Sequence, residues 1–226
     1  MLLVSIFSLN IVDAENKSDK LDLFGKVIIV DPGHGGRDPG TRYGNILEKD
    51  LNLEISKKLV SELENEGAIV YMTRESDIDL SKAGEVNKKR NDLYRRVRFI
   101  ENKKSDLYLS IHLNWFNNRS FSGVEILYNN INKNNKFLAQ TITDSFDNNG
   151  IKTRDIRTTD LYIYRNTTVP GLLIECGFLS NANDRYLLQQ SWYQRKISKI
   201  ITSGSIEYFN NIEWFFIVKS IKKSYN

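Results

Sequence analysis

Short runs of branched apolar residues alternate along this chain with segments whose apolar residues recur at helical spacing. The run at residues 26–31 is continuous and rich in valine and isoleucine, which is typical of a strand buried on both faces. From residue 50 onward, apolar residues recur every fourth position until Gly67, and this period predicts a helix: Leu51, Ile55, Leu59 and Leu63.

The same alternation continues to residue 209 and predicts one α/β domain. Residues 75–89 are polar and without a clear period, so we expect a solvent-exposed loop there. Strands that alternate with helices predict a mostly parallel central sheet with helices on both faces. Further strands are expected at residues 68–73, 107–112, 123–128, 161–164 and 171–176, and further helices at residues 92–103, 137–146, 184–190 and 194–209.

Length and composition fit a single domain with a short segment on each side. The 226 residues are 40% hydrophobic and 27% charged, which is normal for a globular protein with a full core. We expect the domain at residues 26–210, after a polar linker at 15–25. Residues 1–14 are apolar but too short to span a bilayer as a helix. We expect a signal peptide or anchor for export to the cell envelope; the alternative is a short apolar N-terminus without a targeting role. The tail at 211–226 is apolar and then basic, a pattern compatible with docking on the domain or with a peripheral membrane contact, although such ends are more often a loosely packed helix or disordered.

Charge and cysteine content exclude several kinds of site. The formal net charge is +4, a small excess carried by lysines that are scattered and not arranged in a stripe. This pattern is compatible with an acidic wall polymer as partner, and it does not predict nucleic-acid binding. Because Cys176 is the only cysteine, the chain can form neither an internal disulfide nor a cysteine-based zinc cluster.

A glycine-rich stretch, DPGHGGRDPG, follows the first predicted strand and contains His34. A dinucleotide-binding loop needs G-x-G-x-x-G with a helix directly behind it, and a phosphate-binding loop needs a lysine at a fixed position. The dinucleotide-binding pattern is absent, because the glycine spacing differs and the predicted helix starts only near residue 50. The phosphate-binding pattern is absent, because the required lysine is missing. Glycines around a histidine instead permit unusual backbone angles and close approach of a substrate to a metal.

The two histidines of the chain stand at equivalent places. His34 follows one predicted strand and His112 ends another, and the carboxyl ends of parallel strands meet at one crevice. A shared zinc site is therefore favoured, although two histidines need a third protein ligand. Glu48 is one candidate, but its spacing alone fits an exposed carboxylate at a helix start better. Glu175 is flanked by apolar residues in GLLIECGF, where a glutamate is costly unless it is paired or near a metal.

Five ordered motifs resemble those of the zinc-dependent N-acetylmuramoyl-L-alanine amidases of the amidase_3 type. The resemblance extends over residues 26–209 and rests on these segments: VDPGHGGRDPG, LEKDLNLEI, TRESD, SDLYLSIHLN and VPGLLIECGFLSN. It implies that His34, Glu48 and His112 hold one zinc ion and that Glu175 is the catalytic carboxylate. It also implies hydrolysis of the amide between the lactyl group of N-acetylmuramic acid and the L-alanine of the peptidoglycan stem peptide.

Within the family, the motifs resemble those of amidases that act on the spore cortex. This similarity implies a role in cortex maturation, in the first step towards muramic-δ-lactam, which germination needs. Three residues are further candidates for substrate contact: Asn114, Arg74 and Leu161. Two alternatives remain open from sequence: a non-catalytic peptidoglycan-binding module of the same fold, and an amidase that needs an accessory protein to complete its zinc site.

Overall fold

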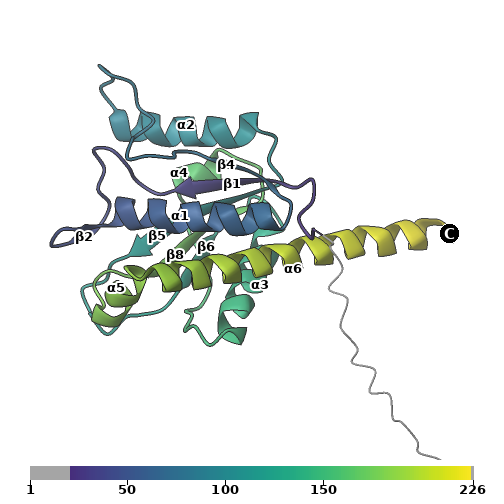
Figure 1. Cartoon of the computed structure of the whole chain (residues 1–226). Helices are drawn as coiled ribbons and strands as arrows, with labels where there is room; N and C mark the ends of the chain where they lie inside the picture. Colours follow the sequence, from purple (N-terminus) through teal and green to yellow (C-terminus); the bar gives the residue numbers. More distant parts are fainter. Residues whose placement is uncertain (1–20, 225–226) are drawn as a thin grey trace, which may run out of the picture.

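The computed structural model describes residues 21–224, with side chains described up to residue 212. Its centre is a six-stranded sheet in the order β4-β1-β5-β8-β6-β7 (Figure 1). Strands β4, β1, β5 and β8 are parallel, and β6 is antiparallel to β8 and parallel to β7. The strands are β1 (Val27–Pro32), β4 (Ile69–Met72), β5 (Leu107–Asn114), β6 (Glu125–Tyr128), β7 (Arg157–Thr158) and β8 (Gly171–Phe178).

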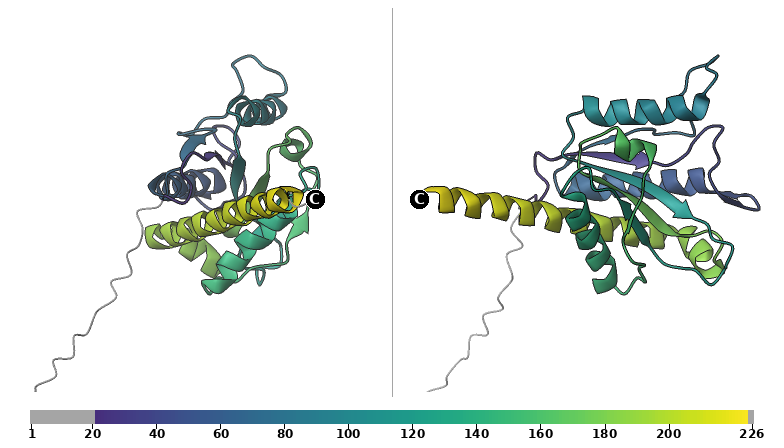
Figure 2. Two further views of the ribbon diagram at one scale, coloured as in Figure 1. Left: turned by 90° about the vertical axis from the view of Figure 1, so that its right-hand side faces the viewer. Right: turned by 180° about the vertical axis from the view of Figure 1, so that it is seen from behind.

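Helices cover both faces of this sheet, as the sequence predicts. The helices are α1 (Glu48–Asn65), α2 (Lys88–Asn102), α3 (Asn135–Asn148), α4 (Tyr162–Arg165), α5 (Ala182–Leu188) and α6 (Ser191–Ser224). Helices α1, α3, α5 and α6 share one apolar cluster with the sheet, and α2 and α4 share the other (Figure 2). Ile28 and Val30 of β1 belong to the first cluster and Ile29 to the second, because successive strand residues point to opposite faces.

The antiparallel direction of β6 follows from the length of its connection. Strand β5 ends at Asn114 and β6 begins at Glu125. A crossover that returns a strand in the same direction usually needs a dozen or more residues and a helix. The short loop at 115–124 therefore turns back at the same end of the sheet, and β6 runs against its neighbour β8. The expectation of a mostly parallel sheet still holds.

The strand predicted at 161–164 is wrong, because this segment forms the short helix α4. One helical turn buries Ile163 and Tyr164 and leaves Arg165 exposed. The hydroxyl of Tyr164 donates a hydrogen bond of 2.5 Å to the carbonyl of Leu127 on β6. An apolar run of four residues is too short for its period to distinguish strand from helix, so tertiary packing decides the conformation.

The boundaries of three helices also differ from the predicted ones. Helix α1 begins at Glu48, so this residue is the first of the helix and does not precede it. Helix α2 begins at Lys88, inside the predicted loop. Helix α6 runs past residue 209 to Ser224 and extends beyond the body of the domain (Figure 1). A hairpin of β2 (Arg42–Tyr43) and β3 (Ile46–Leu47) was not predicted.

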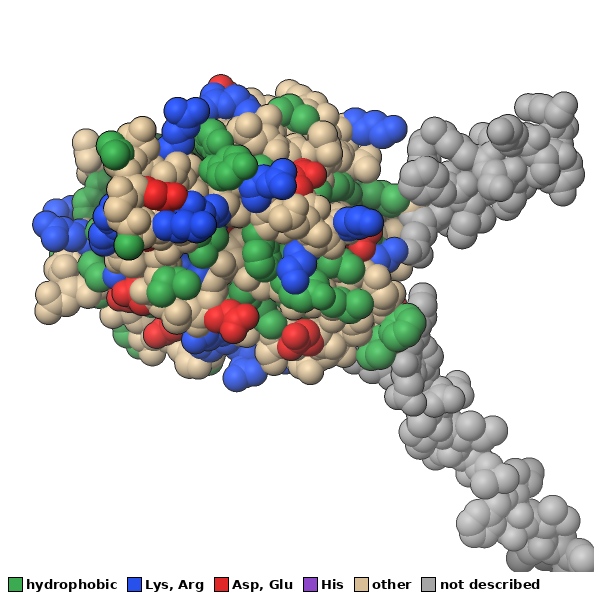
Figure 3. Space-filling view, turned by 90° about the horizontal axis from the view of Figure 1, so that it is seen from above, with side chains coloured by type: hydrophobic (Ala, Val, Ile, Leu, Met, Phe, Trp, Pro, Cys, Tyr) green, Lys and Arg blue, Asp and Glu red, His purple; other side chains and the backbone are tan. Residues whose placement is uncertain are grey.

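The predicted signal peptide at 1–14 lies outside the described residues. Within residues 21–224, none of the helices combines the length and apolar character needed to cross a membrane. Seen from above, the surface shows lysine and arginine side chains interspersed with acidic and apolar ones (Figure 3). This distribution agrees with the scattered charge of the sequence.

Candidate active site

Two histidines and two glutamates come together at the carboxyl ends of the central strands. His34 follows β1, His112 lies near the end of β5, and Glu48 is the first residue of α1. The potential ligand atoms of these three residues lie within 4.8 Å of one another. Glu175 lies on β8 directly beside His112 in the strand register. The sheet therefore brings together four side chains that the sequence separates by up to 141 positions (175 − 34).

Both imidazoles converge on one oxygen of Glu48. Its Oε1 lies 3.2 Å from His34 Nε2 and 3.0 Å from His112 Nδ1, and it accepts a hydrogen bond from the Leu113 amide at 3.1 Å. Its Oε2 accepts hydrogen bonds from the amide and the hydroxyl of Thr41. Burial raises the pKa of the Glu48 carboxyl, but the hydrogen bonds from His112 and His34 outweigh it and hold the pKa well below its usual range.

Asp38 fixes the orientation of the His34 ring. Its Oδ2 lies 3.0 Å from His34 Nδ1, so the opposite nitrogen, Nε2, faces Glu48. Burial lowers the pKa of His34, but hydrogen bonds and charge from Glu48 and Asp38 outweigh that effect and raise it. A carboxylate on the far nitrogen of a histidine is the usual way to fix the tautomer of a metal ligand. The sequence did not single out Asp38, although it lies four residues after His34.

Glycines allow the candidate ligands to approach one another so closely. Gly40 has a φ of 66°, and a Cβ added there would lie 2.5 Å from Glu48 Oε2 and 2.7 Å from His34 Cδ2. A Cβ on Gly33 would lie 2.3 Å from the ring of His112. Such distances are far below van der Waals contact, so a side chain at either position would displace a ligand. The glycine-rich stretch thus provides space for imidazole and carboxylate groups.

We expect Gly40→Ala to weaken metal binding by about 10- to 100-fold, the loss typical of a disturbed ligand support. Gly44→Ala is the matched control, because Gly44 also has a positive φ, 58°, but nothing lies within 4 Å of its added Cβ. Both variants carry the left-handed backbone cost of about 1–2 kcal/mol. Metal titration by calorimetry separates the two effects, and equal metal affinities in both variants would contradict the steric explanation.

A family model described as Amidase_3, N-acetylmuramoyl-L-alanine amidase, matches residues 28–207. This chain belongs to the N-acetylmuramoyl-L-alanine amidase family. It is 40% identical to the germination-specific N-acetylmuramoyl-L-alanine amidase of Bacillus subtilis, over 84% of this chain and 82% of that protein. It is 32% identical to the amidase LytC of the same organism, over 84% of this chain but only 37% of LytC.

The solved structures agree with the sequence relatives. The CwlD amidase of Clostridioides difficile, in complex with the GerS lipoprotein, is 34% identical with a TM-score of 0.78, over 82% of this chain and 98% of that one. The chain is therefore an amidase with the fold of this family, as the resemblance of its motifs implies.

In this amidase, a buried ionic network lies beneath His34. Arg96 of α2 is 2% exposed, and it donates hydrogen bonds to Asp31 Oδ1 at 2.6 Å, to Asp92 Oδ2 at 2.8 Å and to the carbonyls of Pro32 and His34. His34 itself has a positive φ of 62°, a strained conformation for a residue with a side chain. Arg96 thus holds the backbone of a candidate ligand in a conformation that it does not favour.

Asp31 completes this network. It is buried, and it also accepts hydrogen bonds from the hydroxyls of Thr73 and Ser110. Burial raises the pKa of Asp31, but the charge of Arg96 and these hydroxyls outweigh it and lower the pKa to about 2. The sequence did carry a signal for the network, since Arg96 lies on the helical face of Leu93, Val97 and Ile100, where a charged residue needs a buried partner.

Arg74 does not lie where a substrate contact requires. Its side chain is buried, and its guanidinium donates hydrogen bonds to the carbonyls of Pro32, Gly33, Lys49 and Ser76. The expectation of substrate contact is therefore corrected, because these carbonyls occupy the donors and burial keeps the group from solvent. Burial also lowers the pKa of Arg74 to about 10. Arg74 instead joins the glycine-rich turn to the start of α1.

Glu175 is half-buried, and its Oε2 has no hydrogen-bond partner among the described residues. Burial and the nearby carboxylates of Glu48 and Glu125 raise its pKa well above the usual range. Glu125 pairs with Glu175 across β6 and β8, and it accepts a hydrogen bond of 2.7 Å from Asn114 Nδ2. Asn114 lies beside the candidate ligands, and Leu161 lines a cavity next to both histidines.

Proposed function

We propose that this amidase hydrolyses the amide between the lactyl group of N-acetylmuramic acid and the L-alanine of the stem peptide, with one zinc ion held by His34, Glu48 and His112. The convergence of these three ligand atoms within 4.8 Å carries the proposal. Two imidazole nitrogens and one carboxylate oxygen fit zinc, and catalytic zinc sites use three protein ligands with a further position open. When bound, the ion supplies Lewis acidity towards the amide carbonyl.

Glu175 acts as the proton carrier of the reaction in this proposal. The Glu175 side chain lines the open hollow beside His34, Glu48 and His112, where its carboxylate can accept a proton from the attacking water and give it to the leaving amine of alanine. The raised pKa of Glu175 favours the protonated form in the absence of a cation. A cation held by His34, Glu48 and His112 would lower that pKa through its charge and so favour the carboxylate form of Glu175, which is the form that acts as a base.

Replacing His112 with alanine should abolish stoichiometric zinc binding, because only two of the three ligands remain. The chain has no histidine besides His34 and His112, so no other imidazole can take over. Asn114→Ala is the matched control, since Asn114 lies two residues further on the same strand and is not a candidate ligand. Elemental analysis of the purified proteins gives the result. One zinc per chain in His112→Ala would refute the ligand set.

We also propose that the amidase acts on spore cortex, in the first step towards muramic-δ-lactam, after export to the envelope. The 40% identity to a germination-specific amidase supports this setting. Cortex and vegetative sacculi, digested side by side and analysed by mass spectrometry, test it. Release of stem peptides from cortex fragments is the expected result, and cleavage of vegetative sacculi alone would contradict the proposal.

An accessory protein is part of the same proposal. The C. difficile CwlD amidase was solved in complex with the GerS lipoprotein, which supports a protein partner for this amidase too. The non-catalytic binding module is disfavoured, because a module that only grips peptidoglycan has no need of a half-buried carboxylate beside a three-ligand cluster.

A further inference from the structure

Two hollows meet at the candidate ligands, and they differ in character. The first, called here the apolar cavity, has a volume of about 200 Å³ and a mostly apolar lining surface. Its lining includes Leu93, Leu161, Ile163 and Leu173, together with the charged residues Asp31, Asp38, Lys89, Asp92 and Arg96. The second, the open groove, has a volume of about 380 Å³ and is lined by Glu48, Asn114, Trp115 and Glu175 among others. His34 and His112 line both hollows. When the scissile amide lies at these residues, the part of the substrate on one side of the bond therefore enters one hollow and the part on the other side enters the second.

The shapes of the hollows indicate which side of the substrate each receives. A glycan strand is a polar polymer that continues in both directions, so it must lie across an open, polar surface. The apolar cavity is the more enclosed of the two and suits a small apolar group such as the methyl of alanine. With this placement, the stem peptide extends from the candidate ligands through the apolar cavity and along the first turn of α2.

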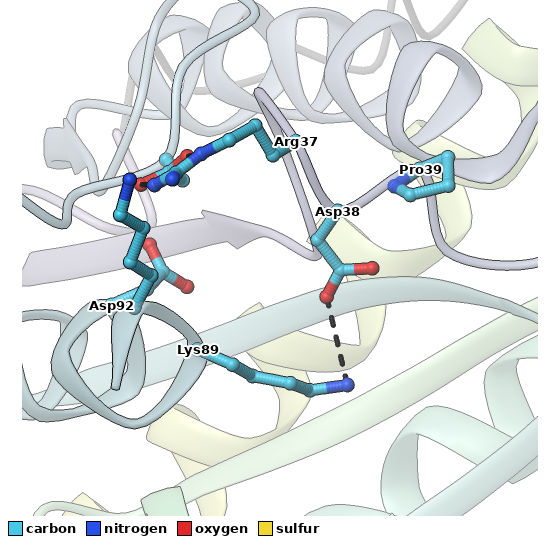
Figure 4. A pocket seen from close by; sticks show the side chains of 7 residues that line it. Arg37, Asp38, Pro39, Lys89 and Asp92 are labelled. Atoms are coloured by element: carbon cyan, nitrogen blue, oxygen red, sulfur yellow. Dashed lines mark hydrogen bonds and ion pairs between the residues drawn. The ribbon is translucent and has the colours of Figure 1, made fainter. Parts of the chain in front are cut away.

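Lys89 of α2 stands where these hollows join. It lines the apolar cavity, the open groove and a third hollow of about 290 Å³ beside them. Figure 4 shows its side chain extending from α2 towards Asp38. The ammonium lies 3.7 Å from Asp38 Oδ2, and the side chain is 77% exposed. An ion pair this long and exposed is weak, so Lys89 is free to exchange Asp38 for another carboxylate.

Helix stability does not explain a lysine at this position. Lys88, Lys89 and Arg90 open α2, and its first turn contains no acidic residue. Positive charge at a helix N-terminus opposes the helix dipole. Lys89 is thus unfavourable for the helix but places a positive charge where three hollows meet, and this combination indicates a role in binding.

We propose that Lys89 recognises the stem peptide by pairing with the free α-carboxylate of the D-glutamate that follows alanine. The inference rests on the proposed function, because it assumes that the lactyl–alanine amide lies at the ligands. Lys89 is thus a residue that determines specificity for acidic peptides and takes no part in the bond cleavage. Asp38, released from Lys89, keeps its contact with His34 Nδ1.

The test compares two disaccharide tripeptides in which the α-carboxyl of D-glutamate is either free or amidated. We expect Lys89→Met to lower kcat/KM about tenfold on the free acid, the size of a hydrogen bond to a charged group, and to leave the amide within about twofold of wild type. Arg90→Met is the matched control. It removes one positive charge from the same helix turn, but Arg90 lines neither hollow at the ligands, so both substrates should react as with wild type.

A binding measurement separates recognition from turnover. In the Glu175→Gln background, calorimetry should show a preference for the free acid over the amide, and adding Lys89→Met should abolish it. An equal loss on both substrates, or no loss on either, would overturn the inference while leaving the proposed function intact. If the wild-type enzyme cleaves neither substrate, the proposed function itself fails.

Discussion

Glu175→Gln should lower kcat by about 10²- to 10⁴-fold, the contribution typical of a positioned general acid–base group, while zinc stays bound. Glutamine keeps the size of the side chain but cannot accept the proton of water. Glu175 is not part of the three-residue ligand cluster, so the metal content of the variant should equal that of wild type. Stem-peptide release from purified muropeptides measures the rate, and elemental analysis measures the metal.

Glu125→Gln is the matched control, because Glu125 is the carboxylate directly across from Glu175 on β6. Its oxygens are engaged by Asn114, at 2.7 Å, and by Arg157, at 3.4 Å, whereas Glu175 Oε2 has no described partner. We expect Glu125→Gln to retain most of the activity. The assignment of the base is wrong if Glu175→Gln works at near the wild-type rate, or if Glu125→Gln is the more damaging of the two.

Arg96→Met should lower the free energy of unfolding by about 3–5 kcal/mol, the usual cost of removing one partner from a buried ion pair. The substitution leaves Asp31 charged and buried, and it leaves the carbonyls of Pro32 and His34 without the donors that they have in the wild type. Methionine has a similar length and good helix propensity, so the change tests charge and hydrogen bonding more than packing. The midpoint of urea unfolding gives the result.

Arg98→Met serves as the control for Arg96→Met. Arg98 lies two residues further on α2 and is exposed, and exposed substitutions away from special contacts change stability little. If both variants unfold at the same urea concentration, the network under His34 contributes no more than a surface charge. A further consequence concerns the metal: His34 loses a contact that holds its positive φ, so metal affinity should fall in Arg96→Met and not in Arg98→Met.

The parts of the fold that local patterns encode could be predicted from sequence. The continuous apolar run of β1 and the four-residue period of α1 are properties of neighbouring residues, and both elements lie where these patterns put them. The rule that parallel strands end at one crevice placed His34 and His112 together. Glu48 was different, because nothing in its spacing distinguishes a ligand from an exposed helix-start carboxylate.

What could not be predicted depends on contacts between distant segments. The conformation of 161–164 is set by packing against β6, and the role of Arg96 is set by Asp31, 65 residues earlier. The sequence cannot distinguish Arg74 from a substrate-binding arginine. Only its position beneath the glycine-rich turn shows that its partners are backbone carbonyls. Asp38 acts by orienting His34. No sequence motif marks such a residue, so it can be recognised only once the orientation of the His34 ring is known.

The adjacency of β5 and β8 has a consequence for how this architecture can change over time. His112 and Glu175 face each other across two central, hydrogen-bonded strands, whose separation is fixed at about 4.8 Å in any sheet. The spacing between the backbones of His112, a candidate ligand, and Glu175, the proposed proton carrier, is therefore set by the geometry of the sheet and not by the surrounding loops. Insertions and deletions in the loops around the site can therefore change which wall fragments bind, while the relative position of these two strands stays the same.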